Sequence, residues 1–329
     1  MIHMAEENLF IWKLKINGKK RRMDMGCGTF TSKDWIRYTA SRGYTADSSA
    51  SDMYKSISVK KEFEPVGITY RESCDSEEHP DSTPIILGLD VTGSMSSVLE
   101  IISKKLHTLI NEIYDREPVK DPQVMVMAFG DVECDRHPLQ VTQFESDIRI
   151  AEQLNNIYFE RGGGGNNGES YTLPWYFAAR HTKIDSYEKH GRKGFLFTMG
   201  DEPFLNIISK NAIKKFTGDD IQADLTADEL LTEVSRQYEI YHLMIEEGSG
   251  MRIGRDDVAA KWTNLLGQRA IAVSDCSKIP EIIVSILEIA AGKDVKEVED
   301  SWEDETALVV SRAISGLAVI NDNNDLIEF

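Results

Sequence analysis

The sequence contains no apolar run that approaches the roughly 18 to 20 residues needed to cross a bilayer. Cysteine is scarce, and the four thiols of the 329 residues lie far apart without a Cys-x-x-Cys pair, at Cys27, Cys74, Cys134 and Cys276. This spacing excludes a disulfide framework and a zinc ribbon. Basic residues are also few, because 37 Lys and Arg face 55 Asp and Glu, for a net charge of −18. That balance argues against a protein that binds nucleic acid or anionic lipid.

What is present is enough apolar material for a folded core, with 41% hydrophobic and 9% aromatic residues. The first ten residues include Glu6 and Glu7 where a signal peptide would have a basic stretch followed by an apolar run. We therefore expect a cytoplasmic protein with reduced thiols. The length predicts about two domains, or one large domain with extensions.

Short buried strands alternate with helices from Pro84 onward. Continuous apolar runs predict strands, and apolar residues at helical spacing predict helices. The strands are expected at 85–89, 124–129, 194–199, 239–245 and 270–273, and the helices at 98–114, 147–159, 170–184, 227–238, 256–266 and 278–291. This alternation predicts a Rossmann-like α/β fold of three layers, in which a doubly wound, mostly parallel sheet has helices on both faces.

Two segments of different character flank this α/β domain, which we place at residues 84–292. Residues 1–83 form an N-terminal extension of uncertain fold, with a short helix expected at 32–41 after a cap at Thr31 or Ser32. Residues 293–329 are expected to form an acidic linker and a C-terminal helix that packs on the body or on a partner.

Ligands of such sheets bind at the loops that follow the carboxyl ends of the strands. The first loop reads Asp90-Val-Thr-Gly-Ser-Met, so Asp90, Thr92 and Ser94 supply one carboxylate and two hydroxyls, which suit a hard cation such as magnesium. The loop resembles the metal-ion-dependent adhesion site (MIDAS) of von Willebrand factor A (VWA) domains, Asp-x-Ser-x-Ser, with Thr in the middle place. The alternative is a helix N-cap formed by Ser94, Ser96 or Ser97.

The second loop is glycine-rich and runs from Gly162 to Tyr171 as GGGGNNGESY. It fits the dinucleotide spacing but follows no apolar strand, and it fits the phosphate loop except that Glu169 replaces the lysine and would repel phosphate. VWA-like domains have Gly-Gly-Gly-Thr here, or Gly-Gly-Gly-Asp-x-Pro-Glu in some intracellular relatives. The resemblance places Asn166 at the Thr or Asp position and Glu169 at the Glu position, with Ser170 as a substitute ligand. The alternative is a flexible loop in which Glu169 and Ser170 cap the next helix.

The third loop, TMGDEPF from Thr198 to Phe204, follows the third buried strand. The resemblance implies that Asp201 holds the metal through water, with Glu202 as a competing neighbour, whereas the alternative is that Asp201 is a turn or N-cap carboxylate. A further loop, DVECD from Asp131 to Asp135, has carboxylates at positions 1, 3 and 5, but Arg136 stands where a calcium loop needs glycine. We expect that loop to be solvated.

The resemblance, which covers about 84–291, implies a non-enzymatic, intracellular module of bacterial or phage type that binds proteins through magnesium, with manganese or calcium as alternatives. Thr92 and Ser94 would bind the ion directly, Asp90 and Asp201 would hold its waters, and Asn166 or Ser170 would be a third ligand. The remaining position would take a carboxylate of a partner protein, and the resemblance favours an AAA+ ATPase, including the MoxR type, as that partner.

Two other functions stay open at this point. One is a metal-dependent hydrolase that uses Asp90, Asp201 and Glu202 around one or two ions. The other is a degenerate VWA fold with a structural role, in which Asn166 marks the loss of metal. No catalytic nucleophile with a base beside it is evident, so we assign no catalytic residue.

Overall fold

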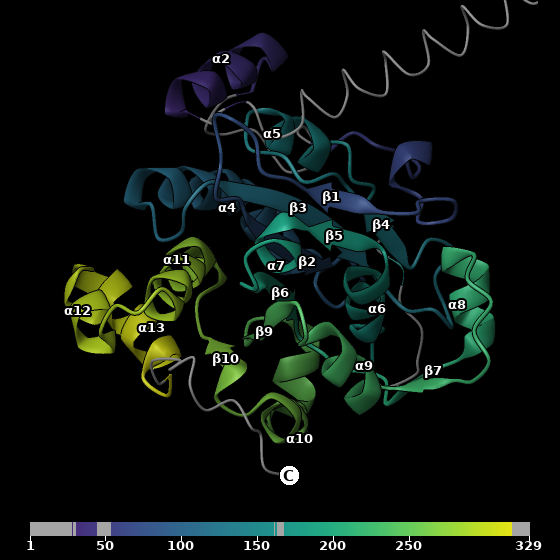
Figure 1. The fold of residues 1–329 in the computed structure, drawn as a ribbon. Helices are drawn as coiled ribbons and strands as arrows, with labels where there is room; N and C mark the ends of the chain where they lie inside the picture. The colour runs from purple at the N-terminus through teal and green to yellow at the C-terminus, as the bar shows by residue number, and fades with distance from the viewer. Residues whose placement is uncertain (1–27, 29–30, 45–53, 161, 163–167, 318–329) are drawn as a thin grey trace, which may run out of the picture.

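The structure is a computed structural model that describes residues 28, 31–44, 54–160, 162 and 168–317. Its central sheet has six strands in the order β10-β9-β6-β2-β3-β4 (Figure 1). All neighbouring strands are parallel except β3 and the short edge strand β4, which are antiparallel. The strands are β2 (Thr83–Asp90), β3 (Pro122–Phe129), β4 (Leu139–Val141), β6 (Gly194–Gly200), β9 (Tyr238–Ile245) and β10 (Ala270–Val273). The predicted mostly parallel sheet is confirmed.

Helices cover both faces of this sheet, as the continuous apolar strands require. Ile85 and Leu87 of β2 face one core and Ile86 faces the other. The first core includes residues of α4 (Ser96–Arg116), α5 (Arg149–Leu154), α11 (Ile279–Ala290), α12 (Val295–Asp300) and α13 (Asp304–Ile314), and the second includes residues of α6 (Thr172–Arg180), α8 (Lys210–Thr217), α9 (Ala227–Val234) and α10 (Ser249–Leu266). The predicted three-layer α/β fold is therefore confirmed. Among the described residues, no helix is long and apolar enough to span a membrane.

Smaller elements complete the described chain. Two further pairs of strands lie outside the main sheet, one parallel and one antiparallel. They are β1 (Arg71–Ser73) with β5 (Thr182–Ile184), and β7 (Ile207–Ile208) with β8 (Leu225–Thr226). The other elements are α2 (Ser32–Arg42), α7 (Asp185–Glu188), and the 3-10 turns η1 (Lys61–Phe63), η2 (Gly267–Arg269) and η3 (Cys276–Lys278).

The described part of the N-terminal extension packs on the α/β domain. The predicted helix is present as α2, whose N-cap Thr31 accepts a bond from the Asp34 backbone N–H. Tyr38 of this helix is buried and its Oη accepts from Asn155 Nδ2, at the end of α5, over 3.0 Å. Farther along, β1 adds to β5 in parallel register. Further hydrogen bonds, such as those between Cys74 and the Gln123 side chain, also join the extension to the domain.

Three predicted helices are shorter than expected. The helix expected at 227–238 ends at Val234, because Tyr238 already pairs with Gly194 in the sheet. In the other two, other bonds compete for the backbone. The helix expected at 147–159 ends at Leu154, and Tyr158 instead exchanges two bonds with the Gln140 side chain at the sheet edge, at 2.7 and 2.9 Å. The helix expected at 170–184 ends at Arg180, because residues 182–184 pair with β1 as strand β5. In both places tertiary pairing overrides the local apolar spacing.

The expected acidic linker is wrong in its first part, because residues 295–300 form helix α12. Val298 is buried there, and the Trp302 indole N–H donates to Ser285 Oγ of α11 at 2.8 Å. Helix α13 then buries Val310 and Ile314 against the first core. The acidic side chains face solvent while the few apolar ones anchor the tail to the body, so the described part of the tail is a docked pair of helices.

A buried carboxyl group at the sheet edge leads to a pH prediction. Burial raises the pKa of Glu145 to about 7, although Arg149 lies 3.0 Å away and Gln153 Nε2 donates to it. Because this pKa exceeds that of the unfolded chain, the stability contribution is full below about pH 4.5 and is lost as the pH rises through 7, a cost of about 3 kcal/mol. We expect Glu145→Gln to be more stable than the wild type at pH 8 and no more stable at pH 4.5, as measured by urea unfolding.

The control for this prediction is Glu152→Gln, which changes the same charge at an exposed position of α5. It should leave the pH dependence of unfolding unchanged. A Glu145→Gln protein whose stability followed that of the wild type at both pH values would contradict the prediction.

Candidate functional site

The loops that follow β2, β3 and β6 meet at one edge of the sheet, because these three strands are neighbours and parallel. Asp90 is the last residue of β2, Asp201 follows β6 directly, and Asp131 comes two residues after β3. All three aspartates are fully buried. We call the segments around Asp90, Glu169 and Asp201 the first, second and third loops, and residues 130–138 the β3 loop.

A chain of short hydrogen bonds joins the first loop to the third. Thr92 donates to Asp90 Oδ1 from its backbone N–H at 2.9 Å and from its hydroxyl at 2.5 Å. The Ser94 hydroxyl donates to Asp201 Oδ1 at 2.8 Å. The two hydroxyl oxygens lie 3.2 Å apart. The structure therefore brings four of the six predicted residues together, and each hydroxyl proton is bonded to a carboxylate.

The N-cap alternative for the first loop is wrong. The cap residue of α4 is Met95, which makes no side-chain cap bond and has helical backbone angles. Ser94 is instead held by Asp201, 107 positions later in the chain. Its hydroxyl thus belongs to the loop cluster and does not satisfy the helix terminus.

Asp201 does serve as a helix-capping carboxylate, but for a helix that is distant in sequence. Its Oδ2 accepts the Gly250 backbone N–H, in the first turn of α10, at 2.7 Å. A Cβ at Gly248 would overlap the Asp201 side chain, and one at Gly250 would lie 2.6 Å from the Asp201 carbonyl oxygen. The positive end of the α10 dipole therefore stabilises the ionised carboxylate. Burial acts the other way and raises the Asp201 pKa.

Tyr171 connects the second loop with the other two. Its hydroxyl donates to Asp90 Oδ2 at 3.1 Å and accepts the Glu202 backbone N–H at 3.3 Å. A Cβ at Gly200 would overlap this hydroxyl, so only glycine allows the close approach. Both oxygens of Asp90 thus hold hydrogen bonds, one from Thr92 and one from Tyr171.

The second loop is described only in part, and Asn166 lies outside the described residues. Ser170 faces the β3 loop, where its hydroxyl accepts from the Val132 backbone N–H at 3.0 Å and donates to Asp131 Oδ1 at 3.4 Å. Glu169 is buried, and its Oε2 has no hydrogen-bond partner among the described residues. The capping alternative for these two residues is wrong, because α6 has Tyr171 as its cap residue and no side-chain cap bond.

Part of the β3 loop is folded into the site. Our expectation of a solvated loop holds for Glu133, Cys134 and Arg136, which are exposed, and is wrong for two aspartates. Asp131 is fully buried and Asp135 is 8% exposed. Asp135 Oδ2 accepts the Asp131 backbone N–H at 2.8 Å, and a Cβ at either Gly130 or Gly162 would overlap the Asp135 carboxylate. Asp135 thus fills the space between the β3 loop and the second loop.

No family model matches this chain, and no curated protein matches it either. Among solved structures, it is similar to proximal thread matrix protein 1 from the mussel byssus, with 10% identity and a TM-score of 0.42 over 66% of this chain and 49% of that one. It is also similar to the pilus adhesin SpaC from Lactobacillus rhamnosus GG, with 9% identity and a TM-score of 0.41 over 69% and 31%.

A third similar structure is BatB from Bacteroides thetaiotaomicron, with 16% identity and a TM-score of 0.32 over 50% of this chain and 66% of that one. This chain therefore spans about half of the mussel protein, a third of the adhesin and two thirds of BatB. TM-scores and identities this low assign no family.

Negative charge is concentrated where the loops meet. Burial, and then the nearby Asp201, raise the pKa of Asp90 to about 7. Burial is also the main cause that raises the pKa of Glu169 to about 10, followed by the charges of Asp90, Glu202, Asp131 and Asp135. Without a counter-charge, several ionised carboxylates in one buried place repel one another. A cation at this place would relieve that repulsion.

The donor set fits a magnesium ion that uses hydroxyls as well as carboxylates. In the described part of the chain, no three His, Cys, Asp or Glu side chains are arranged to hold a metal by themselves. Neighbouring ligands of an octahedral magnesium ion lie roughly 2.9 Å apart, given bonds of about 2.0 to 2.1 Å. The Thr92 and Ser94 oxygens at 3.2 Å are close to this separation, and their lone pairs are free because their protons are bonded to aspartates.

Sequence reasoning missed Tyr171, Asp131 and the α10 terminus at Gly250. Asp131 carried a usable signal, since it comes two residues after a buried strand whose end lies at the same sheet edge. Tyr171 and Gly250 carried none, because their bonds to Asp90 and Asp201 span 81 and 49 positions of the chain.

Proposed function

We propose that this protein is a non-enzymatic, magnesium-dependent protein-binding module with a MIDAS-type site. The observation that carries the proposal is the chain of bonds from Asp90 through Thr92 and Ser94 to Asp201. Thr92 and Ser94 would bind the ion directly, and Asp90 and Asp201 would orient its waters. The ion would supply an electrophilic position for a carboxylate of the partner.

The second loop would complete the set of ligands through Asn166 or Ser170. Ser170 would first have to leave Asp131, whose carboxylate now accepts its proton at 3.4 Å. The AAA+ ATPase that the resemblance favours is the partner we propose, with an exposed Asp or Glu as the group that reaches the ion. The resemblance to VWA domains supports this choice of partner, and the bonding of the first and third loops supports the choice of metal.

Binding is favoured over hydrolysis because the two central aspartates are already engaged. Asp90 accepts bonds at both oxygens, from Thr92 and Tyr171, and Asp201 accepts bonds at both oxygens, from Ser94 and Gly250. A carboxylate in that state orients other groups and is a poor base or nucleophile. Hydroxyl ligands also leave the ion more of its charge for a partner's carboxylate.

Metal removal tests this proposal. Metal-stripped protein is titrated with magnesium and manganese in a calorimeter, and the immobilised protein is then used to capture proteins from a lysate of its host with magnesium or with EDTA. We expect one ion per chain, and at least one captured protein that EDTA releases and that needs one of its own acidic residues to bind. Identical capture with magnesium and with EDTA would contradict the proposal.

The same preparation separates binding from hydrolysis. Generic phosphatase and nuclease substrates are incubated with the protein and magnesium or manganese. We expect no turnover above that of the Asp90→Ala variant. Turnover that this variant abolishes would replace the binding function with a metal-dependent hydrolase.

A further inference from the structure

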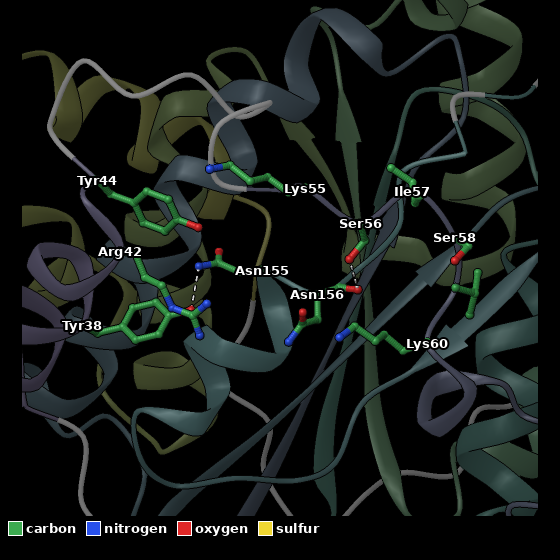
Figure 2. Close-up of a pocket in the computed structure, with 11 residues that line it drawn as sticks. Tyr38, Arg42, Tyr44, Lys55, Ser56, Ile57, Ser58, Lys60, Asn155 and Asn156 are labelled. Carbon is green, nitrogen blue, oxygen red and sulfur yellow. Dashed lines mark hydrogen bonds between the residues drawn. The ribbon is translucent and has the colours of Figure 1, made fainter.

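A groove lies where three segments meet: α2, residues 55–60 and the end of α5 (Figure 2). It encloses about 350 Å³, a volume within the range of small-molecule sites. The metal-site residues Asp90, Thr92, Ser94 and Asp201 are not among the residues that line it. A ligand of the groove would therefore contact none of these four residues.

The groove is positively charged in a strongly acidic protein. Arg42, Lys55 and Lys60 are among the eleven residues that line it, and none of the eleven is acidic. Within the described part of the chain, none of these three cations is paired with a carboxylate within 4 Å. The rest of the chain brings the total charge to −18. Three cations that line one concavity and that no described carboxylate pairs with can bind an anionic ligand.

The floor of the groove is built from buried, hydrogen-bonded side chains. Tyr38 and Asn155 are each 8% exposed and are joined by the 3.0 Å bond from Asn155 Nδ2 to Tyr38 Oη. The Arg42 guanidinium lies 5.2 Å from the centre of the Tyr38 ring, where a cation–π contact holds it. On the other wall, the Ser56 hydroxyl donates to the Asn156 carbonyl at 2.9 Å. These bonds fix the walls that carry the cations.

The two lysines of the groove belong to the segment at residues 55–60. The Lys55 ammonium lies 6.0 Å from the centre of the Tyr44 ring, and in Figure 2 the Lys60 ammonium points toward Asn156. Arginine binds phosphate through a planar pair of N–H groups, and lysine adds point charges. One arginine and two lysines around a small concavity therefore match a phosphate group.

The size of the ligand follows from the charge distribution. At physiological ionic strength charges are screened beyond about 8 Å. A small anion in the groove would therefore interact with the three cations, and with Glu152, whose charge reaches Tyr38, but little with acidic residues farther away. A long polyanion such as nucleic acid would extend over the acidic surface and be repelled. We propose that this groove binds a small phosphate-bearing molecule.

Calorimetry in EDTA tests this inference, with inorganic phosphate, pyrophosphate and ADP as probes and citrate as an anion without phosphate. Ionic strength is held constant. We expect saturable binding of at least one phosphate probe at one site per chain, and the comparison of pyrophosphate with ADP tells whether a nucleoside adds affinity. Arg42→Gln and Lys60→Gln should each weaken that binding about tenfold or more, as expected for the loss of one charge-assisted hydrogen bond.

The chain offers a matched control for each variant. Arg37→Gln removes the same charge from the same helix at a side chain that is 81% exposed, and Lys61→Gln does so next to Lys60 but outside the groove. Both should bind as the wild type does. The inference is overturned if no phosphate probe saturates, if citrate binds equally well, or if the controls lose as much affinity as the groove variants.

Discussion

Replacing Thr92 by valine is expected to weaken magnesium binding roughly a hundredfold or more, because the proposed hydroxyl ligand is lost. Valine keeps the volume of the side chain, so the substitution removes only that hydroxyl. That hydroxyl gives its proton to Asp90 at 2.5 Å and faces Ser94 at 3.2 Å. Removing even a group that only orients a ligand typically costs ten- to a hundredfold in metal affinity, and a direct ligand should cost more. Calorimetric titration of metal-stripped protein measures the change.

Two companion variants make this result specific to the hydroxyl. Thr92→Ser keeps the oxygen, matches the VWA pattern that the loop resembles, and should bind magnesium nearly as well as the wild type. Ser96→Ala removes an exposed hydroxyl two residues beyond Ser94 and should have no effect. If Thr92→Val bound magnesium with the wild-type affinity, Thr92 would not be a metal ligand.

Replacing Trp262 by alanine is expected to lower the free energy of unfolding by about 3 to 5 kcal/mol, the usual cost of deleting a buried tryptophan. The indole is fully buried in an aromatic cluster beneath the third loop. It stacks on His242 at 3.5 Å between ring centres and meets Phe204 at 4.8 Å and Tyr171 at 5.0 Å. Urea unfolding followed by circular dichroism measures the loss.

The same substitution should also disturb the candidate site. The Trp262 indole N–H donates to the Glu202 carbonyl at 3.1 Å, and Tyr171, which contacts this ring, holds Asp90. Trp262→Phe keeps most of the stacking and loses the N–H, so it should cost less stability than alanine. Tyr187→Ala removes an aromatic ring that is 39% exposed and serves as the control. A loss below about 1 kcal/mol for Trp262→Ala would contradict the prediction.

Much of the fold could be predicted because local and global preferences agree along the strands. The five continuous apolar runs are the five parallel strands of the sheet, within two residues at each end. Short elements such as β4, β5 and α8 were not predicted. None of these three segments is a continuous apolar run, and tertiary contacts decide their state.

The candidate site was also predicted only in part. The order of the loops placed Asp90, Thr92, Ser94 and Asp201 at one sheet edge, and the structure joins them by hydrogen bonds. The metal and the partner remain proposals. The β3 loop was expected in solvent because Arg136 stands where a calcium loop needs glycine. Asp131 and Asp135 are nevertheless buried, and Asp135 fits between two glycine backbones.

The sequence by itself determined the strands, their alternation with helices and the three loop motifs, because side-chain period and strand-end position are properties of neighbouring residues. Only the tertiary structure decided that Tyr171 would hold Asp90, that the end of α10 would cap Asp201, and that Arg42 and Lys60 would line one groove. Each of these depends on residues that are far apart in the chain. Such contacts form only when the sheet and its two layers of helices pack together, and no local pattern specifies them.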